Sequence, residues 1–202
     1  MFKIIKARLK FIISTILGFY IIACSSQEYT TAKLAIQQSE WSKVEEWLPK
    51  AMAVEPDNPE IPIVYAIEVH ARNGDWKGMY DMFQKALAID ANKKVEIRAV
   101  FLPVSDQVNN YTQYYWAEEF NKGVEKFKEI QEDPNNRKIY IGEAIEYFIS
   151  ASTINPNDPQ TYTTLSKCYL DLDDKDNAMK FIKTAVEKDP EGFNSNFSAG
   201  QI

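Results

Sequence analysis

The sequence predicts an all-α fold built from helical hairpins that stack along one axis. Within residues 159–190, apolar residues recur at the spacing of one helix face, stop at an acidic turn, and then start again. Alanines at equivalent positions lie 35 residues apart (Ala51 and Ala86) and 34 residues apart (Ala151 and Ala185). A period of this length indicates repeated two-helix units, each of which buries its apolar face against its neighbours.

The segment 159–190 is the clearest of these units. Its first helix aligns Tyr162, Leu165, Ser166 and Tyr169 on one face, and its second helix aligns Ala178, Ile182 and Ala185 before Pro190. This order of aromatic, large, small and proline positions resembles the tetratricopeptide repeat (TPR), with Ser166 and Ile182 as mild departures. The resemblance implies a TPR-like helical-hairpin solenoid of about three to four repeats, one of them enlarged.

Other units follow the same organisation. Asn58 with Pro59, and Asp158 with Pro159, mark helix starts, because Asn and Asp cap helices and Pro suits the first turn. The expected units span residues 25–58, 59–92, 104–158 (enlarged or degenerate) and 159–192, and an uncapped polar tail occupies 193–202. Solenoids usually end in a polar capping helix, so we expect either a longer natural chain or a partner that covers the last apolar face.

The third unit does not fit the period, because 65 residues separate Ala86 from Ala151. One long helix is expected over 105–131, followed by a loop near 133–140 and a second helix. The apolar stripe of the long helix comprises Val108, Tyr111, Tyr115, Trp116, Phe120, Val124 and Phe127. The alternative is a further degenerate repeat between Asn92 and Asn110. The pattern leaves open whether 99–102 is a short helix or a strand.

The first 23 residues have the features of a targeting signal. Residues 1–10 are basic, and the apolar residues 11–23 would form a helix of about 20 Å, against roughly 30 Å of membrane hydrocarbon. The sequence Ile-Ile-Ala before Cys24 resembles a bacterial lipoprotein signal. This resemblance implies cleavage before Cys24 and a lipid on its thiol; the alternative is an uncleaved signal-anchor with an incidental cysteine.

Two or three acyl chains would hold the protein stably on a membrane. Ser25 is not the Asp that would suggest retention in the inner membrane, so we expect an outer-membrane lipoprotein that faces the periplasm; the alternative location is the outer face of the cytoplasmic membrane. Removal of the signal takes away four basic and no acidic residues, which changes the net charge from −6 to −10. So acidic a chain repels phosphate backbones, and nucleic acid is not an expected partner.

The chain has few residues of the types that usually carry out catalysis. The one histidine, His70, lies in a predicted helix, and Cys168 is the only cysteine after Cys24. The turn region of the last hairpin contains Asp171, Asp173, Asp174 and Asp176, without the Gly and terminal Glu of a calcium loop. We therefore expect no enzyme, no metal site, no cofactor and no small-molecule substrate.

The fold favours a scaffold that binds other proteins of the cell envelope. In TPR solenoids the first helix of each unit lines a concave groove, so its residues outside the buried stripe would meet a ligand. These residues are Ile61, Val64, Glu68, Glu118, Asn121, Glu125, Thr163, Lys167 and Asp171. Their carboxylates suit a segment that carries Lys or Arg. The alternative function is a module for a small ligand or glycan in the aromatic region Tyr111–Tyr115.

Overall fold

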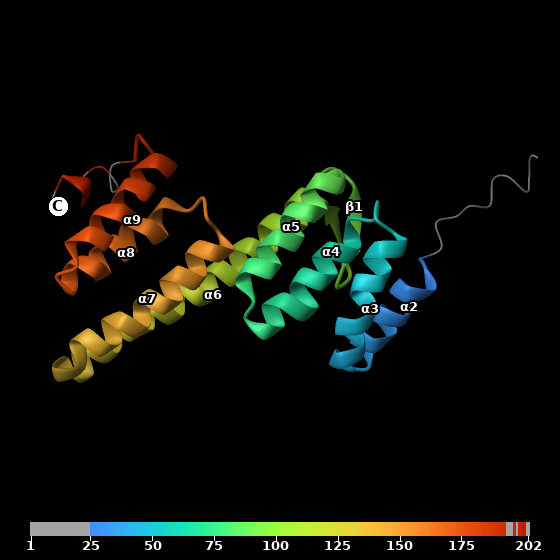
Figure 1. Cartoon of the computed structure of the whole chain (residues 1–202), viewed down its shortest axis with the longest axis horizontal. Coiled ribbons are helices and arrows are strands. Elements are labelled where there is room, and N and C mark those ends of the chain that lie inside the picture. The colour runs from blue at the N-terminus through green and yellow to red at the C-terminus, as the bar shows by residue number, and fades with distance from the viewer. Residues whose placement is uncertain (1–24, 193–195, 197, 201–202) are drawn as a thin grey trace, which may run out of the picture. The chain divides into compact units, whose positions relative to one another are not determined.

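The computed structural model describes residues 25–192, 196 and 198–200, and these form two compact units that divide at Glu55 and Pro56. The predicted signal peptide, Cys24 and part of the predicted tail lie outside the described residues. Within the described residues the predicted all-α class of helical hairpins is confirmed, with one β-hairpin that the repeat pattern does not contain (Figure 1).

The N-terminal unit is a hairpin of α2 (Gln27–Gln37) and α3 (Trp41–Val54). Ser26 is the N-cap of α2, because its hydroxyl oxygen accepts a hydrogen bond of 3.1 Å from the backbone N–H of Tyr29. Ser39 has a φ of 59° in the turn between the helices. The faces that meet are made by Tyr29, Ala32 and Ala35 of α2 and by Val44, Leu48 and Ala51 of α3, all buried.

The second hairpin starts the other unit and contains a change of helix type. Helix α4 (Glu60–Tyr65) widens into the π-helix η1 (Ala66–His70) and then narrows into the 3₁₀-helix η2 (Ala71–Asn73). Gly74, with a φ of 71°, makes the turn into α5 (Trp76–Asp90). The sequence pattern predicts this turn but not the π-helix, which moves the side chains after Tyr65 out of ordinary α-helical register.

The segment after α5 forms an antiparallel β-hairpin of β1 (Lys94–Ile97) and β2 (Val100–Pro103). Arg98 and Ala99 make its two-residue turn with φ values of 50° and 65°. Val95 and Ile97 are buried while their neighbours are exposed, which is the two-residue period of a strand. This hairpin shows that 99–102 belongs to a turn and a strand, and that the alternative of a degenerate helical repeat at this place is wrong.

The predicted long helix is present as α6 (Val104–Glu132). After the short 3₁₀-helix η3 (Pro134–Asn136), the chain returns as α7 (Arg137–Ile154), which lies alongside α6 (Figure 1). The loop is shorter than predicted, because α7 already begins at Arg137 and not after residue 140. The last hairpin is α8 (Pro159–Asp171) and α9 (Lys175–Lys188).

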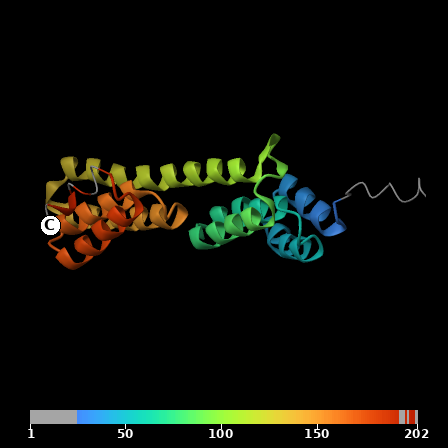
Figure 2. The same cartoon turned by 90° about the horizontal axis from the view of Figure 1, so that it is seen from above.

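Helix α6 belongs to two apolar cores of this unit. The first core contains Ile63, Ala66, Ile67, Met79, Phe83, Val95, Ile97, Val104 and Val108. The second core contains Phe120, Ile130, Ile141, Ala144, Ile145, Phe148, Ala151, Leu165 and Cys168. Between them Trp116 packs against both cores, and its indole N–H donates a 2.9 Å hydrogen bond to the Thr161 hydroxyl of α8. Figure 2 shows α6 running from the β-hairpin to the last helices.

The contact between α6 and α7 corrects one position of the predicted stripe. Val124 is 37% exposed, whereas its neighbour Gly123 is buried against the Phe148 ring. One residue along a helix turns the side chain by about 100°, so only one of the two can face α7. At Gly123 the absence of a side chain lets the ring of Phe148 lie close to the backbone of α6.

We expect Gly123→Ala to destabilise the protein. The added Cβ would lie 2.7 Å from Cε1 of Phe148, whose ring is already packed against Phe120 at 5.0 Å and Phe127 at 6.3 Å. Overpacking costs about 1–3 kcal/mol, which outweighs the gain of about 1 kcal/mol in helix propensity. Urea unfolding would measure this loss.

Gly142→Ala in α7 is the matched control. Nothing lies within 4 Å of a Cβ at Gly142, so the same substitution should raise the free energy of unfolding by up to about 1 kcal/mol. Equal changes of the same sign in the two variants would contradict the close α6–α7 contact.

Candidate ligand-binding surface

One face of α6 stays exposed along most of the helix. We define the outer line of α6 as the exposed residues that recur every three or four positions on this face: Asn110, Tyr114, Glu118, Asn121 and Glu125. The buried residues Glu119, Gly123 and Ile130 lie on the opposite face. At 1.5 Å per residue the outer line is about 22 Å long, which is enough for six or seven residues of an extended peptide.

The charges on this line are only partly neutralised. Lys122 lies 3.5 Å from Glu118 but 2.6 Å from Glu119, which is buried. The hydrogen bond with Glu119 is the main cause of the raised pKa of Lys122, so this lysine mainly serves the buried carboxylate. Among the described residues Glu125 makes no ion pair. The outer line is therefore acidic, and its carboxylates are accessible.

Lys126 does not neutralise the outer line either. Its ammonium group lies 3.0 Å from Glu129 and 2.8 Å from Glu143 of α7, so it joins the two helices. The hydrogen bond to Glu143 is the first cause of the raised pKa of Lys126.

The structure corrects two of the nine predicted groove residues. Ile61 is completely buried, and Thr163 is 6% exposed with its hydroxyl donating to the backbone carbonyl of Pro159 at 3.0 Å. A buried side chain cannot contact a ligand without rearrangement. The periodicity failed here because it treats a helix as having one buried face, whereas these helices are covered on more than one side.

The remaining predicted residues fall into separate places. Val64 is half-buried against the first core. Lys167 and Asp171 are exposed on α8, and Asp171 accepts a 2.7 Å ion-pair contact from Arg137 of α7. Arg137 was missed, because a contact between residues 34 positions apart leaves no mark in helical periodicity.

Beside the start of the outer line lies a hollow of about 480 Å³, which we call the tyrosine hollow. It is lined by Arg98, Asn110, Tyr111, Tyr114 and Tyr115. Tyr115 lies at the centre of the aromatic contacts: its ring is stacked with that of Tyr111 at 6.5 Å and meets that of Tyr114 edge-on at 5.1 Å. The predicted aromatic region therefore forms a surface, on which Tyr114 is 61% exposed.

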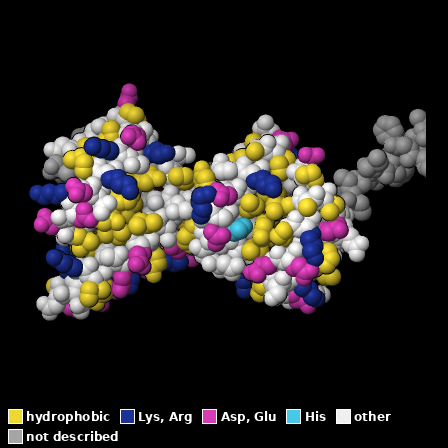
Figure 3. All heavy atoms as spheres, in the orientation of Figure 1, with side chains coloured by type: hydrophobic (Ala, Val, Ile, Leu, Met, Phe, Trp, Pro, Cys, Tyr) yellow, Lys and Arg dark blue, Asp and Glu magenta, His cyan; other side chains and the backbone are white. Residues whose placement is uncertain are grey.

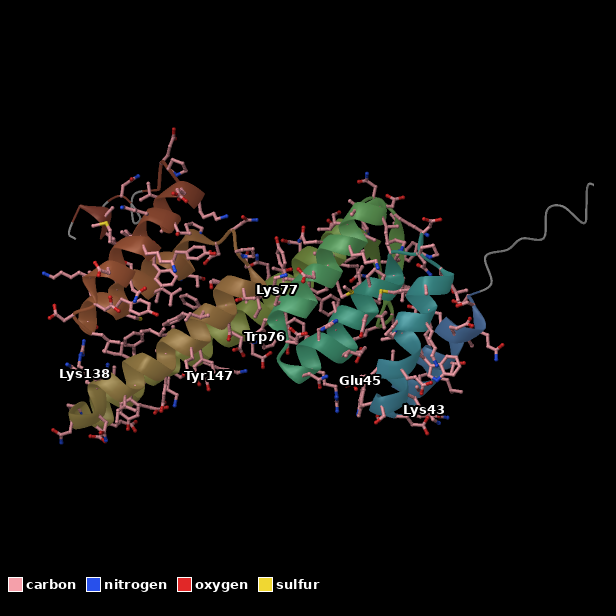
Figure 4. The ribbon with its side chains drawn as sticks, in the orientation of Figure 1. Lys43, Glu45, Trp76, Lys77, Lys138 and Tyr147 are labelled. Carbon is pink, nitrogen blue, oxygen red and sulfur yellow. The ribbon has the colours of Figure 1, made fainter. Side chains whose placement is uncertain are left out.

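Helix α5 packs against the tyrosine rings through Trp76. Trp76, the first residue of α5 (Figure 4), lies 5.8 Å from Tyr115. Burial raises the pKa of both Tyr111 and Tyr115 further above the ordinary phenol value, and their protonated phenol groups can donate hydrogen bonds at neutral pH.

Among the described residues, the ion pair of Arg98 and Glu68 brings charge to this hollow. The Arg98 guanidinium donates from Nε at 3.0 Å and from Nη2 at 2.8 Å, both to Oε1 of Glu68. Glu68, a predicted groove residue, lies in the π-helix η1 and its side chain is only 12% exposed. The sequence pattern did not predict a role for Arg98. Its position depends on the positive φ values of Arg98 and Ala99, and nothing in the residue types of this turn indicates such a conformation.

His70 and Cys168 behave as structural residues. Nδ1 of His70 lies 2.7 Å from Oδ2 of Asp75, which caps α5, and its ring lies 4.7 Å from that of Tyr65 (Figure 3 shows His70 in cyan). Burial raises the pKa of the Cys168 thiol to about 12, so it stays protonated and uncharged in the second core.

Two other features are absent from the part of the chain that the structure describes. There, no group of three or more His, Cys, Asp or Glu residues could hold a metal ion. No helix in the same part is long and apolar enough to cross a membrane.

Comparison with known proteins places a repeat in the C-terminal part of the chain. Residues 141–197, which include most of α7 and both helices of the last hairpin, match the family described as tetratricopeptide repeat. None of the curated proteins compared with the chain matches it. The match agrees with the unit that the sequence pattern identified as clearest.

Solved structures resemble the chain only loosely. A crystal structure of MamA is 14% identical over 84% of this chain and 81% of its own, with a TM-score of 0.34. YrrB, described as a TPR protein with an unusual peptide-binding site, is 12% identical over 89% and 93%, with a TM-score of 0.35. The pHSP90 complex of the TPR2AB domain of yeast Sti1 is 15% identical over 84% and 66%, with a TM-score of 0.37.

The cap of α5 yields a pH-dependent prediction. Asp75 accepts a 2.9 Å hydrogen bond from the backbone N–H of Gly78, and this bond, followed by that with His70, holds the pKa of Asp75 below its usual 3.8. Because the folded-state pKa is lowered, the carboxylate stabilises the fold fully well above pH 3.8, and this contribution is lost as the pH falls through the lowered value.

We expect Asp75→Ala to lower the free energy of unfolding by about 1 kcal/mol at neutral pH, and Asp75→Asn to lose less, since its amide oxygen can still cap the helix. Urea unfolding between neutral pH and pH 3 would show wild type losing its advantage over Asp75→Asn in acid. Equal losses for both variants at every pH would contradict the capping role.

Proposed function

We propose that the protein is a non-enzymatic scaffold that binds segments of other cell-envelope proteins along the outer line of α6 and the exposed face of α8. The observation that carries this proposal is the outer line itself. It is a continuous exposed strip of about 22 Å on a helix whose opposite face is anchored in two cores. Such a strip presents side chains in fixed positions, which lowers the conformational cost of binding.

The chemistry of the strip suits a partner segment that carries Lys or Arg. Glu118 and Glu125 present two accessible carboxylates, and Tyr114 adds an exposed aromatic ring at one end. Tyrosine is enriched where binding energy concentrates in protein interfaces. The carboxylates would act mainly through the association rate, so binding should weaken as the ionic strength rises.

The TPR match of residues 141–197 supports this proposal in general terms, because the repeat resemblance implies protein ligands. It does not identify the partner, since a repeat fold carries many different binding surfaces.

A lipid on Cys24 would hold this scaffold at the membrane. The support is the sequence before Cys24, with its basic start, short apolar core and small residue at position 23. We infer an outer-membrane lipoprotein with the scaffold in the periplasm, where the partners would also be found.

The binding surface can be tested by charge reversal. Partners would be captured from detergent-solubilised envelope, purified, and titrated against wild-type and Glu118→Lys/Glu125→Lys protein. The double variant should bind about tenfold or more weakly, because two attractive charges become repulsive. Its binding should no longer weaken as the ionic strength rises, because salt now screens a repulsion.

Glu146→Lys/Glu187→Lys is the matched control, since it makes the same change in net charge at exposed positions of α7 and α9. The control should keep the wild-type affinity. If both double variants lose the same affinity, only net charge matters and the outer line is not the binding surface.

The anchor can be tested separately. Cys24→Ser should abolish incorporation of radiolabelled palmitate and leave either an unprocessed precursor or a form released from the membrane, because serine cannot form the thioether. A variant that is labelled and fractionates like wild type would contradict the lipoprotein assignment.

A further inference from the structure

We propose that the tyrosine hollow is a binding site for a neutral, hydroxyl-rich glycan chain, in addition to the protein-binding surface. The site combines an exposed aromatic ring, several polar groups and a balanced pair of charges. Each of these features restricts the chemistry of the ligand, and together they favour a sugar over a peptide.

The first feature is the shape. The hollow has a volume of about 480 Å³, within the range of small-ligand sites, and Tyr114 stands at its side with 61% of its surface exposed. The face of a sugar ring carries C–H groups that pack well on the negative face of an aromatic ring. Because Tyr114 is held edge-on against Tyr115 at 5.1 Å, its ring is supported in the free protein.

The second feature is the set of hydrogen-bonding groups. Asn110 offers a donor and an acceptor, and Tyr111 and Tyr115 keep their phenol protons at neutral pH. Arg98 uses Nε and Nη2 for Glu68, which leaves Nη1 with two N–H donors. Mixed donors and acceptors at close range match hydroxyl groups, each of which both donates and accepts.

The third feature is the charge balance. Arg98 lies against Glu68, so a carboxylate ligand drawn to the guanidinium would meet the glutamate, and an ammonium ligand drawn to the glutamate would meet the guanidinium. The chain as a whole carries excess negative charge, which further opposes acidic ligands. An uncharged ligand meets neither penalty and still receives strong hydrogen bonds from charged donors.

The fourth feature is that the site is built in advance. Gln107, 2% exposed, donates through Nε2 to the carbonyl oxygen of Val100 at 2.7 Å and also lies 3.4 Å from that of Val95, which fixes the β-hairpin on α6. The hairpin turn holds Arg98 and Ala99 at positive φ, a conformation that costs energy for residues other than glycine. This turn and the π-helix that carries Glu68 are the two backbone irregularities that bring the ion pair to the hollow.

The test is titration calorimetry of the signal-free, otherwise full-length chain with maltohexaose, cellohexaose and N-acetylchitohexaose, three neutral chains of different linkage. We expect at least one to bind with a 1:1 stoichiometry. Tyr114→Ala should weaken that binding about tenfold or more, and Glu68→Gln should weaken it by releasing Arg98 from its position.

Tyr147→Ala, which removes a half-buried tyrosine of α7 outside the hollow (Figure 4), is the control and should bind like wild type. Circular dichroism would show that each variant is folded. The proposal is overturned if none of the three glycans binds, or if Tyr114→Ala binds them as tightly as Tyr147→Ala does. It is also overturned if Tyr114→Ala weakens the binding of a partner peptide but leaves the affinity for all three glycans unchanged.

A failure of glycan binding would not contradict the proposed protein-binding function, because the test of that function changes Glu118 and Glu125 and is measured with protein partners. Lost partner binding together with retained glycan binding in Glu118→Lys/Glu125→Lys, whose substituted residues do not line the hollow, would show two separate activities on one helix.

Discussion

The continuity of α6 is the constraint on which the larger unit depends. A single helix of 29 residues must bury its first turns with Val104 and Val108 in one core and its later turns with Phe120 and Ile130 in another. The residues that α6 contributes to the two cores are not those of the outer line, which stays exposed from Asn110 to Glu125. The outer line of α6 is therefore a consequence of packing on the other side.

Where two helices must approach closely, side-chain size decides the geometry. Gly123 allows the ring of Phe148 to lie against the backbone of α6, and Trp116 joins the two cores while its N–H is satisfied by Thr161. A polar group in such a position destabilises a fold unless it has a partner, so the hydroxyl of Thr161 is as necessary as the apolar contacts. These contacts fix α6, the helix that carries the outer line and most residues of the tyrosine hollow.

The two candidate surfaces share Asn110 and Tyr114 but differ in physical character. Further along α6 the carboxylates are accessible and attract opposite charge at a distance. At the hollow the Glu68–Arg98 pair cancels at long range, so recognition depends on short-range stacking and hydrogen bonds. One helix can therefore offer a charge-dependent and a charge-independent site side by side, because screening and distance separate their effects.

The sequence by itself determined the helical hairpins, the long helix 105–131 and most of the buried small residues, such as Ala144 and Ala178. These features follow from periodicity and from caps such as Asp158, which act over a few residues.

Only the tertiary structure decided the β-hairpin's place on α6, the burial of Ile61 and Thr163, and the tyrosine hollow. The hollow needs Glu68 to meet Arg98, 30 residues away, through a π-helix and a left-handed turn. Local patterns record which face of a helix is apolar. They do not record which distant segment covers that face, because the contact energy belongs to the pair and not to either stretch of chain.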